Sequence, residues 1–253
     1  MRPVIIGAGR GSRLGPETES IPKTLVPVMG RPMLEWILEA LADAGFSKRD
    51  VIFISGYAEE VVRERYPDFT YVRNADWENN NILHSLLCAR EHLGDGFIST
   101  YADIVYDGAI VRALADSPQD IVLGCDTHWR RRYTERSQHP ETDAEKLRAE
   151  GSRVVELSRN IPSEGAQGEF IGVMKLTPGG ARDLISAFDA VAARPPEGVW
   201  REGRTFRKAY LIDLLQHMLE AGTEMHRADT PGAYMEIDTL EDLAHAKQWW
   251  ESR

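Results

Sequence analysis

Cationic side chains accompany a glycine-rich stretch near the start of the chain, VIIGAGRGSRLGPETESIPKTLVPV at positions 4–28. Glycine lets the backbone approach an anion closely and turn its N–H groups toward phosphate oxygens. Arg13 can grip such oxygens with two parallel hydrogen bonds, and Lys23 supplies a compact point charge. The stretch therefore indicates a phosphate-binding loop rather than a simple surface turn.

Two common phosphate-binding motifs do not match this loop. A P-loop requires GxxxxGK[ST], and no such run follows the strand expected at 3–7. A dinucleotide fingerprint requires GxGxxG, but Ser12 or Leu14 stands where its third glycine would be. What remains is GAGRGSRL followed by a polar segment and then Pro22-Lys23.

The elements around this loop alternate between apolar strand-like runs and amphipathic helical runs. We expect strands at 3–7, 51–55, 71–74, 97–102 and 121–125, and helices at 33–45, 59–66, 81–93 and 107–116. Such alternation predicts an α/β fold with a Rossmann-like, mostly parallel sheet flanked by helices.

The pattern changes after Asp126. Runs at 153–158 and 169–176 are typical of antiparallel strands joined by a polar loop, and helices are expected at 179–193 and 207–221. The chain then continues with a strand or two within 225–238 and a helix opened by the TLED capping box at Thr239. We predict one domain over 1–253, with a core at 1–126 and an inserted antiparallel β-rich lid and closing helices within 127–253.

Composition narrows the classes of function. A net charge of −10 disfavours a non-specific nucleic-acid surface. No run approaches the roughly 18 apolar residues of a membrane span, and no leader pattern is visible, so we expect a cytoplasmic protein without membrane contact. Cys88 and Cys125 lack CxxC spacing, which disfavours a zinc site or disulfide framework, and both are predicted to be buried thiols.

The loop and its two cations resemble the GxGxR(L)…PK signature of the nucleotidyltransferase family, which makes nucleotide sugars and related activated metabolites. The resemblance implies that the loop binds a nucleoside triphosphate and stabilises the departing pyrophosphate. It assigns catalytic neutralisation of the phosphates to Arg13 and Lys23. The nucleotide-binding backbone would then come from Gly7, Ala8, Gly9, Gly11 and Ser12.

Two aspartates stand where this resemblance implies ligands of Mg²⁺. Asp103 follows the strand-like FISTYA, and ligands of open α/β sheets bind beyond the carboxyl ends of strands. Asp238 ends AYMEI directly before a helix, so a helix N-cap is its alternative role. Asp107 is expected to begin the next helix, and Glu236 is not assigned to the metal.

Two longer stretches resemble the phosphocholine and phosphonate cytidylyltransferase branch of the family. They are NADWENNNILHSLLCA at 74–89 and DTHWRRRYTERSQHPETDAEKL at 126–147, the latter leading to GEFIGVMKL. The resemblance implies CTP as donor and a small phosphorylated or phosphonate acceptor. Asn80, Asn81 and Ser85 are candidates for reading cytosine, and helix capping is the alternative for the asparagines.

The second stretch also supplies candidates for binding the acceptor head group. Trp129 and Tyr133 would suit a quaternary ammonium through cation–π attraction, with Glu169 facing it. If the segment is helical, Arg136 shares their face, and Arg130 and Arg131 turn to solvent. Inward arginines would instead suit a carboxylated phosphonate, so both head groups remain open.

The implied chemistry needs little from side chains. The dianion of a phosphate monoester is already a nucleophile near neutral pH, so transfer requires positioning and charge neutralisation rather than a covalent intermediate. One alternative is a sugar-1-phosphate uridylyl- or thymidylyltransferase. Another, from a different class, is a non-catalytic nucleotide-binding regulatory module. Trp249 and Trp250 near the C-terminus are consistent with packing or a homodimer contact.

Overall fold

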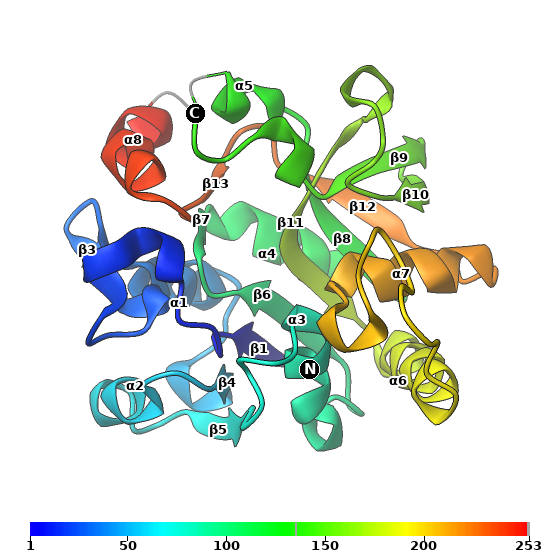
Figure 1. Cartoon of the computed structure of the whole chain (residues 1–253), viewed down its shortest axis with the longest axis horizontal. Helices are drawn as coiled ribbons and strands as arrows, with labels where there is room; N and C mark the ends of the chain where they lie inside the picture. The colour runs from blue at the N-terminus through cyan, green and yellow to red at the C-terminus, as the bar shows by residue number, and fades with distance from the viewer. Residues whose placement is uncertain (135, 252–253) are drawn as a thin grey trace.

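The computed structural model describes residues 1–134 and 136–251, and within them the chain forms a nine-stranded mixed sheet (Figure 1). The strand order is β5-β4-β1-β6-β11-β8-β12-β10-β9. The strands are β1 (Arg2–Ile6), β4 (Ile52–Ser55), β5 (Thr70–Arg73), β6 (Phe97–Tyr101), β8 (Ile121–Asp126), β9 (Lys146–Glu150), β10 (Arg153–Leu157), β11 (Gly168–Leu176) and β12 (His226–Asp229). Strands β5 to β6 run parallel, as does β12 beside β8, whereas β11 is antiparallel to both of its long neighbours.

Helices cover both faces of this sheet, because alternate strand residues point to opposite sides. Val4 and Ile6 of β1 pack in one cluster with α3 (Ile82–Cys88), α6 (Pro178–Ala193) and α7 (Leu211–Glu220). Ile5 between them packs in another cluster with α1 (Met33–Asp43), α2 (Glu59–Arg65) and α4 (Gly108–Asp116). The predicted parallel core between helical layers is therefore confirmed.

Two short antiparallel ribbons lie outside the main sheet. One pairs β2 (Pro27–Val28) with β3 (Arg31–Pro32), and the other pairs β7 (Ile104–Tyr106) with β13 (Tyr234–Glu236). Helix α8 (Leu240–Glu251) packs on β13, and its start is the predicted capping box. The Thr239 hydroxyl accepts from the Asp242 N–H (3.2 Å), and the Asp242 carboxylate accepts from the Thr239 N–H (2.9 Å).

The second half of the chain differs from its prediction in one pairing. The strands expected at 153–158 and 169–176 do not pair with each other, because β9 lies between them. The sequence of β9, KLRAE, is short and contains Lys, Ala and Glu, which are depleted in strands, and it is held by pairing with both β10 and β11. The antiparallel hairpin β9–β10 thus extends the main sheet at the end opposite to β5 (Figure 1).

Three smaller predictions are corrected. Helix α7 begins at Leu211, because Phe206–Lys208 forms a separate 3₁₀ turn. The helix expected at 81–93 ends at Cys88 and is followed by a 3₁₀ turn at Arg90–His92. Cys88 is exposed on that helix, whereas Cys125 is buried as expected. Asp107 caps α4 through its side chain, as predicted.

Within the described ranges, no helix has the length and apolar character needed to span a membrane.

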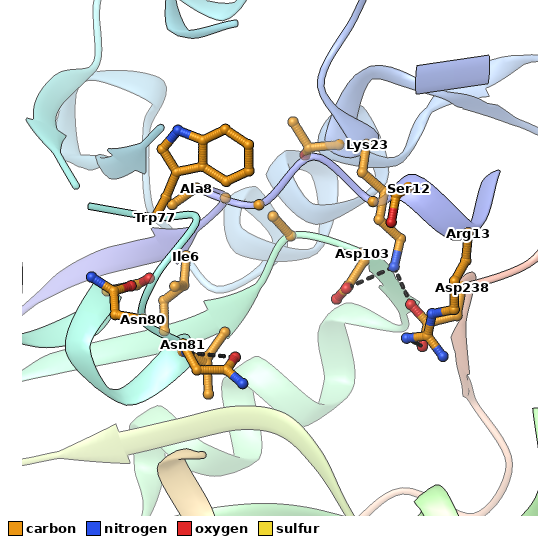
Figure 2. A pocket seen from close by; sticks show the side chains of 17 residues that line it. Ile6, Ala8, Ser12, Arg13, Lys23, Trp77, Asn80, Asn81, Asp103 and Asp238 are labelled. Carbon is orange, nitrogen blue, oxygen red and sulfur yellow. Dashed lines mark hydrogen bonds and ion pairs between the residues drawn. The ribbon is translucent and has the colours of Figure 1, made fainter. Parts of the chain in front are cut away.

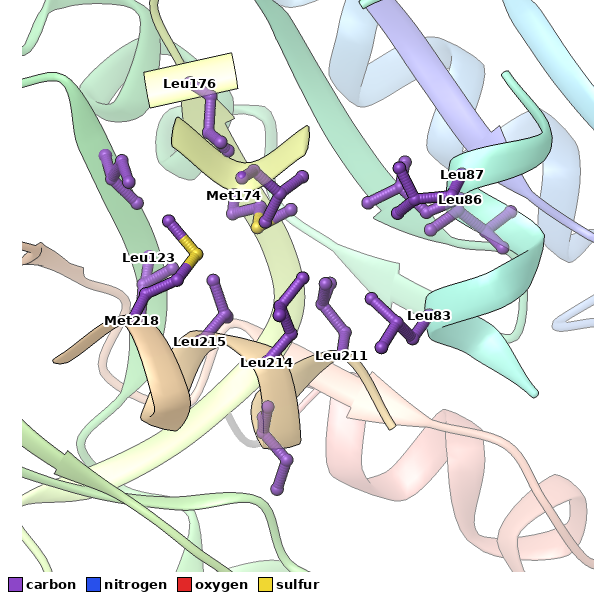
Figure 3. Close-up of a cluster of buried hydrophobic side chains, with 14 of the residues drawn as sticks. Leu83, Leu86, Leu87, Leu123, Met174, Leu176, Leu211, Leu214, Leu215 and Met218 are labelled. Carbon is purple, nitrogen blue, oxygen red and sulfur yellow. The ribbon is translucent and has the colours of Figure 1, made fainter. Parts of the chain in front are cut away.

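We predict that Leu214→Ala lowers the free energy of unfolding by about 2–5 kcal/mol, because it empties a fully buried site between α7 and the sheet (Figure 3). Leu240→Ala is the matched control, since Leu240 is 47% exposed. Urea unfolding of both variants measures the difference. Equal destabilisation of the two variants would contradict the assignment of this cluster to the core.

Candidate active site

A cavity of about 290 Å³ opens at the carboxyl ends of β1 and β6, beside the glycine-rich loop (Figure 2). Every residue predicted to contact the nucleotide lies in its wall: Gly7, Ala8, Gly9, Gly11, Ser12, Arg13, Lys23, Asn80, Asn81 and Ser85. Both predicted metal ligands, Asp103 and Asp238, line it as well. The structure therefore brings residues from four separate parts of the sequence to one place.

Gly11 is the glycine on which the geometry of the loop depends. Its φ of +75° lies in the left-handed region, which side-chain-bearing residues rarely adopt. A Cβ atom at this position would also lie 2.6 Å from Cδ of Lys23. Gly11 thus permits both the turn of the loop and the passage of the lysine side chain across it.

The two aspartates meet because of the β7–β13 ribbon. Asp103 directly precedes β7, and the N–H of Ile237 donates to the Asp103 carbonyl oxygen (3.0 Å). Asp238 follows at the next position, while Thr239 takes the N-cap of α8. The alternative role of Asp238 as helix cap is therefore filled by its neighbour, and its carboxylate turns toward the glycine loop.

Lys23 joins the two carboxylates. Its Nζ donates to Oδ2 of Asp103 (2.8 Å) and to Oδ1 of Asp238, while Arg13 donates to Oδ2 of Asp238 (2.6 Å; Figure 2). Burial alone lowers the pKa of the Lys23 ammonium, but the Asp103 and Asp238 carboxylates outweigh burial and raise it. Burial likewise acts to raise the pKa of Asp238, yet Lys23 and Arg13 hold that pKa below its usual range. The charged forms of Lys23 and Asp238 therefore stabilise each other.

Two further residues beside Asp238 were not assigned from the sequence. His139, Glu236 and Asp238 each offer a ligand atom within 4.8 Å of the others. Burial, together with the nearby Asp238 and Asp103 carboxylates, raises the pKa of Glu236 well above its ordinary value. The carboxylate oxygens of Glu236 and Asp238, with the imidazole of His139 beside them, fit a divalent cation, whose charge would relieve the repulsion between the carboxylates.

The asparagine run at the start of α3 has a mixed role. The Asn81 side chain caps the helix by accepting from the Ile82 N–H (2.8 Å), so the capping alternative is correct for this residue. Asn80 instead exchanges hydrogen bonds with the amide of Asn74 (2.8 and 3.0 Å), and Asn74 also donates to Ser85 (2.9 Å). These polar groups form a rigid edge on the cavity wall, next to the indole of Trp77.

A second cavity, of about 370 Å³, adjoins the first. The residues that line both cavities are Arg13, Asn81, Ile82, Asp103 and Asp238. The second cavity continues between β11 and the segments around α5 and α7, where its wall contains aromatic rings, carboxylates and a further arginine, Arg159. The carboxylates and Arg13 therefore stand at the boundary between two adjacent cavities.

Of the four residues predicted to bind the acceptor, Glu169 lines this second cavity. Trp129, Tyr133 and Arg136 are buried behind its wall, and the prediction that they contact the acceptor needs correction. The two rings pack on Ala144, and the Tyr133 hydroxyl donates to Glu169 (2.7 Å). Arg136 is held by Asp242 (2.8 Å) and the Glu236 carbonyl (2.7 Å).

Arg132 is the residue of this segment that the sequence did not single out. Helix α5 (Arg130–Tyr133) turns Arg130 and Arg131 outward, as predicted, and Arg132 inward. There it donates to Asp126 and to Glu169 (2.5 Å), with all three side chains buried. The partners of the buried arginine, Asp126 on β8 and Glu169 on β11, come from distant parts of the sequence, so its pairing could not be read from the RRRY stretch.

Comparison with known proteins agrees with this geometry. Residues 3–156 match the model of a family described as the MobA-like NTP transferase domain. A CTP:phosphoglutamine cytidylyltransferase from Campylobacter jejuni is 24% identical over 253 residues, covering 96% of this chain and 98% of that relative. A 2-aminoethylphosphonate cytidylyltransferase from Lancefieldella rimae is 35% identical over 96 residues, but the match covers only 37% of this chain and 38% of that relative.

A solved structure of a CTP:phosphocholine cytidylyltransferase from Streptococcus pneumoniae aligns with a TM-score of 0.72 at 21% identity, covering 100% of this chain and 99% of that one. At this identity the likeness concerns the fold. It confirms the predicted fold class along the whole chain.

We predict that Arg132→Met destabilises the protein by about 3–5 kcal/mol, because it leaves the buried Asp126 and Glu169 carboxylates uncompensated. Arg130→Met, at a side chain 48% exposed, is the matched control and should change stability by less than about 0.5 kcal/mol. Chemical denaturation measures both. A loss for Arg132→Met no greater than that of the control would show that the buried pairing is energetically unimportant.

Proposed function

The chain belongs to the family of MobA-like NTP transferase domains, and we propose that it transfers CMP from CTP to a small phosphorylated or phosphonate acceptor, with release of pyrophosphate. The observation that carries this proposal is the pair of adjacent cavities that share Arg13, Asp103 and Asp238. A nucleotide in one cavity and an acceptor in the other would meet at these charges. The predicted resemblance to nucleotidyltransferases is confirmed by the family match.

The choice of CTP rests on the relatives. The relative that matches this chain nearly end to end is named as a cytidylyltransferase for phosphoglutamine, and the phosphonate relative is also a cytidylyltransferase. In the first cavity, we assign the triphosphate to the glycine loop, and the base to the edge formed by Asn80, Asn81 and Ser85. The amide and hydroxyl groups of this edge match the donor and acceptors of cytosine.

The reaction is a single displacement. A phosphate or phosphonate oxygen of the acceptor forms a bond to the α-phosphorus of CTP, and the bond from that phosphorus to the bridging oxygen of the β-phosphate breaks. The electron pair leaves with pyrophosphate, so no protein nucleophile is needed. Lys23 and Arg13 hold the phosphate oxygens and neutralise the developing charge.

We assign the divalent cation, Mg²⁺, to Asp103 and Asp238, with Glu236 beside them. When bound, such a cation supplies charge neutralisation at the phosphates. In the structure Lys23 bridges the same two carboxylates. The ammonium therefore lies within reach of both the metal ligands and the phosphates that we place beside the glycine loop.

We further assign nucleotide binding mainly to residues 1–126 and acceptor binding mainly to 127–253, within one domain. Asp238 is the exception, because the β7–β13 ribbon carries it into the nucleotide site. A cytoplasmic location follows from the proposed substrates, which are intracellular metabolites. The homodimer stays a prediction, as does the absence of nucleic-acid and membrane partners.

Pyrophosphate release in the presence of Mg²⁺ tests the proposal. CTP, UTP, dTTP, ATP and GTP are each paired with phosphocholine, aminophosphonates, phosphorylated amino acids and glucose-1-phosphate. We expect release with CTP and a non-sugar acceptor. Release with UTP or dTTP and glucose-1-phosphate would contradict cytidylyl transfer and identify the protein as a sugar-1-phosphate nucleotidyltransferase. Absence of release with every pair would contradict transferase activity.

We predict that Lys23→Ala lowers kcat by about 100-fold or more, because removal of one group that stabilises transition-state charge typically has this effect. Lys48→Ala is the control, since Lys48 is a largely exposed lysine remote from both cavities. Circular dichroism shows whether both variants keep the fold. Near-normal turnover of folded Lys23→Ala would remove this residue from the mechanism.

We predict that Asp103→Asn abolishes Mg²⁺-dependent turnover and weakens Mn²⁺ binding measured by electron paramagnetic resonance, because a neutral amide is a poor ligand for a hard cation. Asp107→Asn is the matched control, since asparagine also caps helices well. Unchanged Mn²⁺ affinity in Asp103→Asn would place the metal site elsewhere.

A further inference from the structure

Arg159 joins Arg13 as a second arginine among the described residues that line the second cavity, and the same wall holds the carboxylates of Asp143, Glu145, Glu169 and Glu236. Its buried Nε finds no hydrogen-bond partner within the described part of the chain. Its nearest carboxylate, Glu145, lies 3.8 Å away, which is beyond hydrogen-bond length. A partly exposed guanidinium in a cavity wall, with its Nε buried and unpartnered there, is suited to bind an anion.

Contacts with neighbouring side chains fix the position of the Arg159 guanidinium. Its guanidinium lies over the ring of Tyr210, with Cζ 4.2 Å from the ring centroid. The same ring is contacted by Arg204 at 4.0 Å, and Arg204 is paired with the buried Asp213 (3.1 Å). These contacts hold the guanidinium in place without using its hydrogen-bonding edge, which is the requirement for recognition of a ligand.

Glu145 offers a complementary negative charge beside Arg159. It is buried and accepts a hydrogen bond from the Tyr101 hydroxyl (3.2 Å). Burial raises its pKa to about 7, against the opposing effects of Arg159 and Tyr101. Glu169, in contrast, is already paired with Arg132 and Tyr133. Glu145 is therefore a carboxylate beside Arg159 whose charge a cationic ligand would compensate.

Two of the aromatic side chains that line the cavity, Tyr210 and Tyr234, already pack against arginines of the protein itself. Arg159 and Arg204 contact the ring of Tyr210, and Arg132 lies 4.6 Å from the centroid of Tyr234. Cation–π attraction requires access to a ring face, and the protein's own guanidinium groups already occupy faces of both rings. A choline-like head group would compete with these internal cations.

We propose that the acceptor head group is a zwitterion, with its carboxylate bound by Arg159 and its primary ammonium bound by Glu145, as in a phosphorylated or phosphonate α-amino acid. This inference rests on the proposed function and specifies its substrate class. In an α-amino acid, the two charges sit on adjacent groups, as do the facing charges of Arg159 and Glu145. The ligand exchanges one long internal ion pair for two charge-assisted contacts.

The test uses acceptors that differ in one group. 2-Amino-4-phosphonobutyrate carries both charges, 3-aminopropylphosphonate lacks the carboxylate, and 4-phosphonobutyrate lacks the amine. O-phosphoserine, phosphoethanolamine and 3-phosphooxypropionate repeat the comparison at a shorter length, and phosphocholine supplies the quaternary ammonium. With CTP, we expect kcat/KM for the amino acid of the better-fitting set to exceed that of its two analogues at least about tenfold.

Arg159→Gln should raise the KM for the amino acid by about 10- to 100-fold, leave the KM for CTP unchanged, and remove the preference over the analogue without a carboxylate. Arg159→Lys should restore part of the preference. Arg148→Gln is the control, since Arg148 pairs with Glu156 (2.9 Å) on the surface. An unchanged KM for CTP shows that the variant is folded and that the effect is local to the acceptor.

Failure of this inference is distinct from failure of the proposed function. Transfer from CTP with phosphocholine or an amine-only acceptor preferred would overturn the zwitterion while leaving cytidylyl transfer intact. If no acceptor supports pyrophosphate release, cytidylyl transfer fails, and calorimetric titration of 2-amino-4-phosphonobutyrate into the wild type and Arg159→Gln decides the zwitterion separately. Weaker binding to the variant supports the inference, and equal or undetectable binding to both overturns it.

Discussion

The site depends on two carboxylates from distant parts of the sequence, Asp103 and Asp238, being held against one buried lysine, Lys23. Like charges at close range repel, and burial makes that repulsion stronger. Asp103 and Asp238 remain together because the β7–β13 ribbon fixes their backbones and because Lys23 and Arg13 neutralise them. The segment that leads into α8 supplies the Asp238 carboxylate. The stretch that follows the glycine loop supplies the two cations, Arg13 and Lys23, that pair with it.

This charge network lies where the two cavities meet, so it can act on a ligand in either of them. The phosphates of both proposed substrates are anionic, and the protein as a whole has a net charge of −10. An anionic ligand is therefore attracted locally, by the backbone amides of the loop and by Arg13 and Lys23, rather than by the overall field. Arg159 extends the same principle to the second cavity, where it stands beside several carboxylates of the wall.

Local sequence signals predicted which residues gather in the first cavity, because each signal lies within a short stretch. The glycine loop, the asparagine run and Asp103 all follow strands whose apolar runs are easy to recognise, and all line the first cavity. For Asp238 the sequence left two roles open, metal ligand and helix cap. The structure rules out the cap, because Thr239 and Asp242 form it.

The acceptor half was less predictable, because its residues acquire their roles from distant partners. Arg159 gains a role from Tyr210, and Glu145 from Arg159, and none of these pairings has a sequence spacing that signals it. The aromatic residues of α5 were expected to contact the acceptor, since aromatic side chains suit such walls. They pack inward instead, because β9 and β11 close over them, and β9 itself was not evident from its polar sequence.

Initial-rate kinetics would test most directly whether the two cavities act together at the shared carboxylates. Pyrophosphate release is measured while CTP and the acceptor are varied independently. We predict intersecting double-reciprocal lines, because both substrates must be bound before the α-phosphorus is attacked. Parallel lines, or release of pyrophosphate that does not require the acceptor, would contradict direct transfer between adjoining cavities.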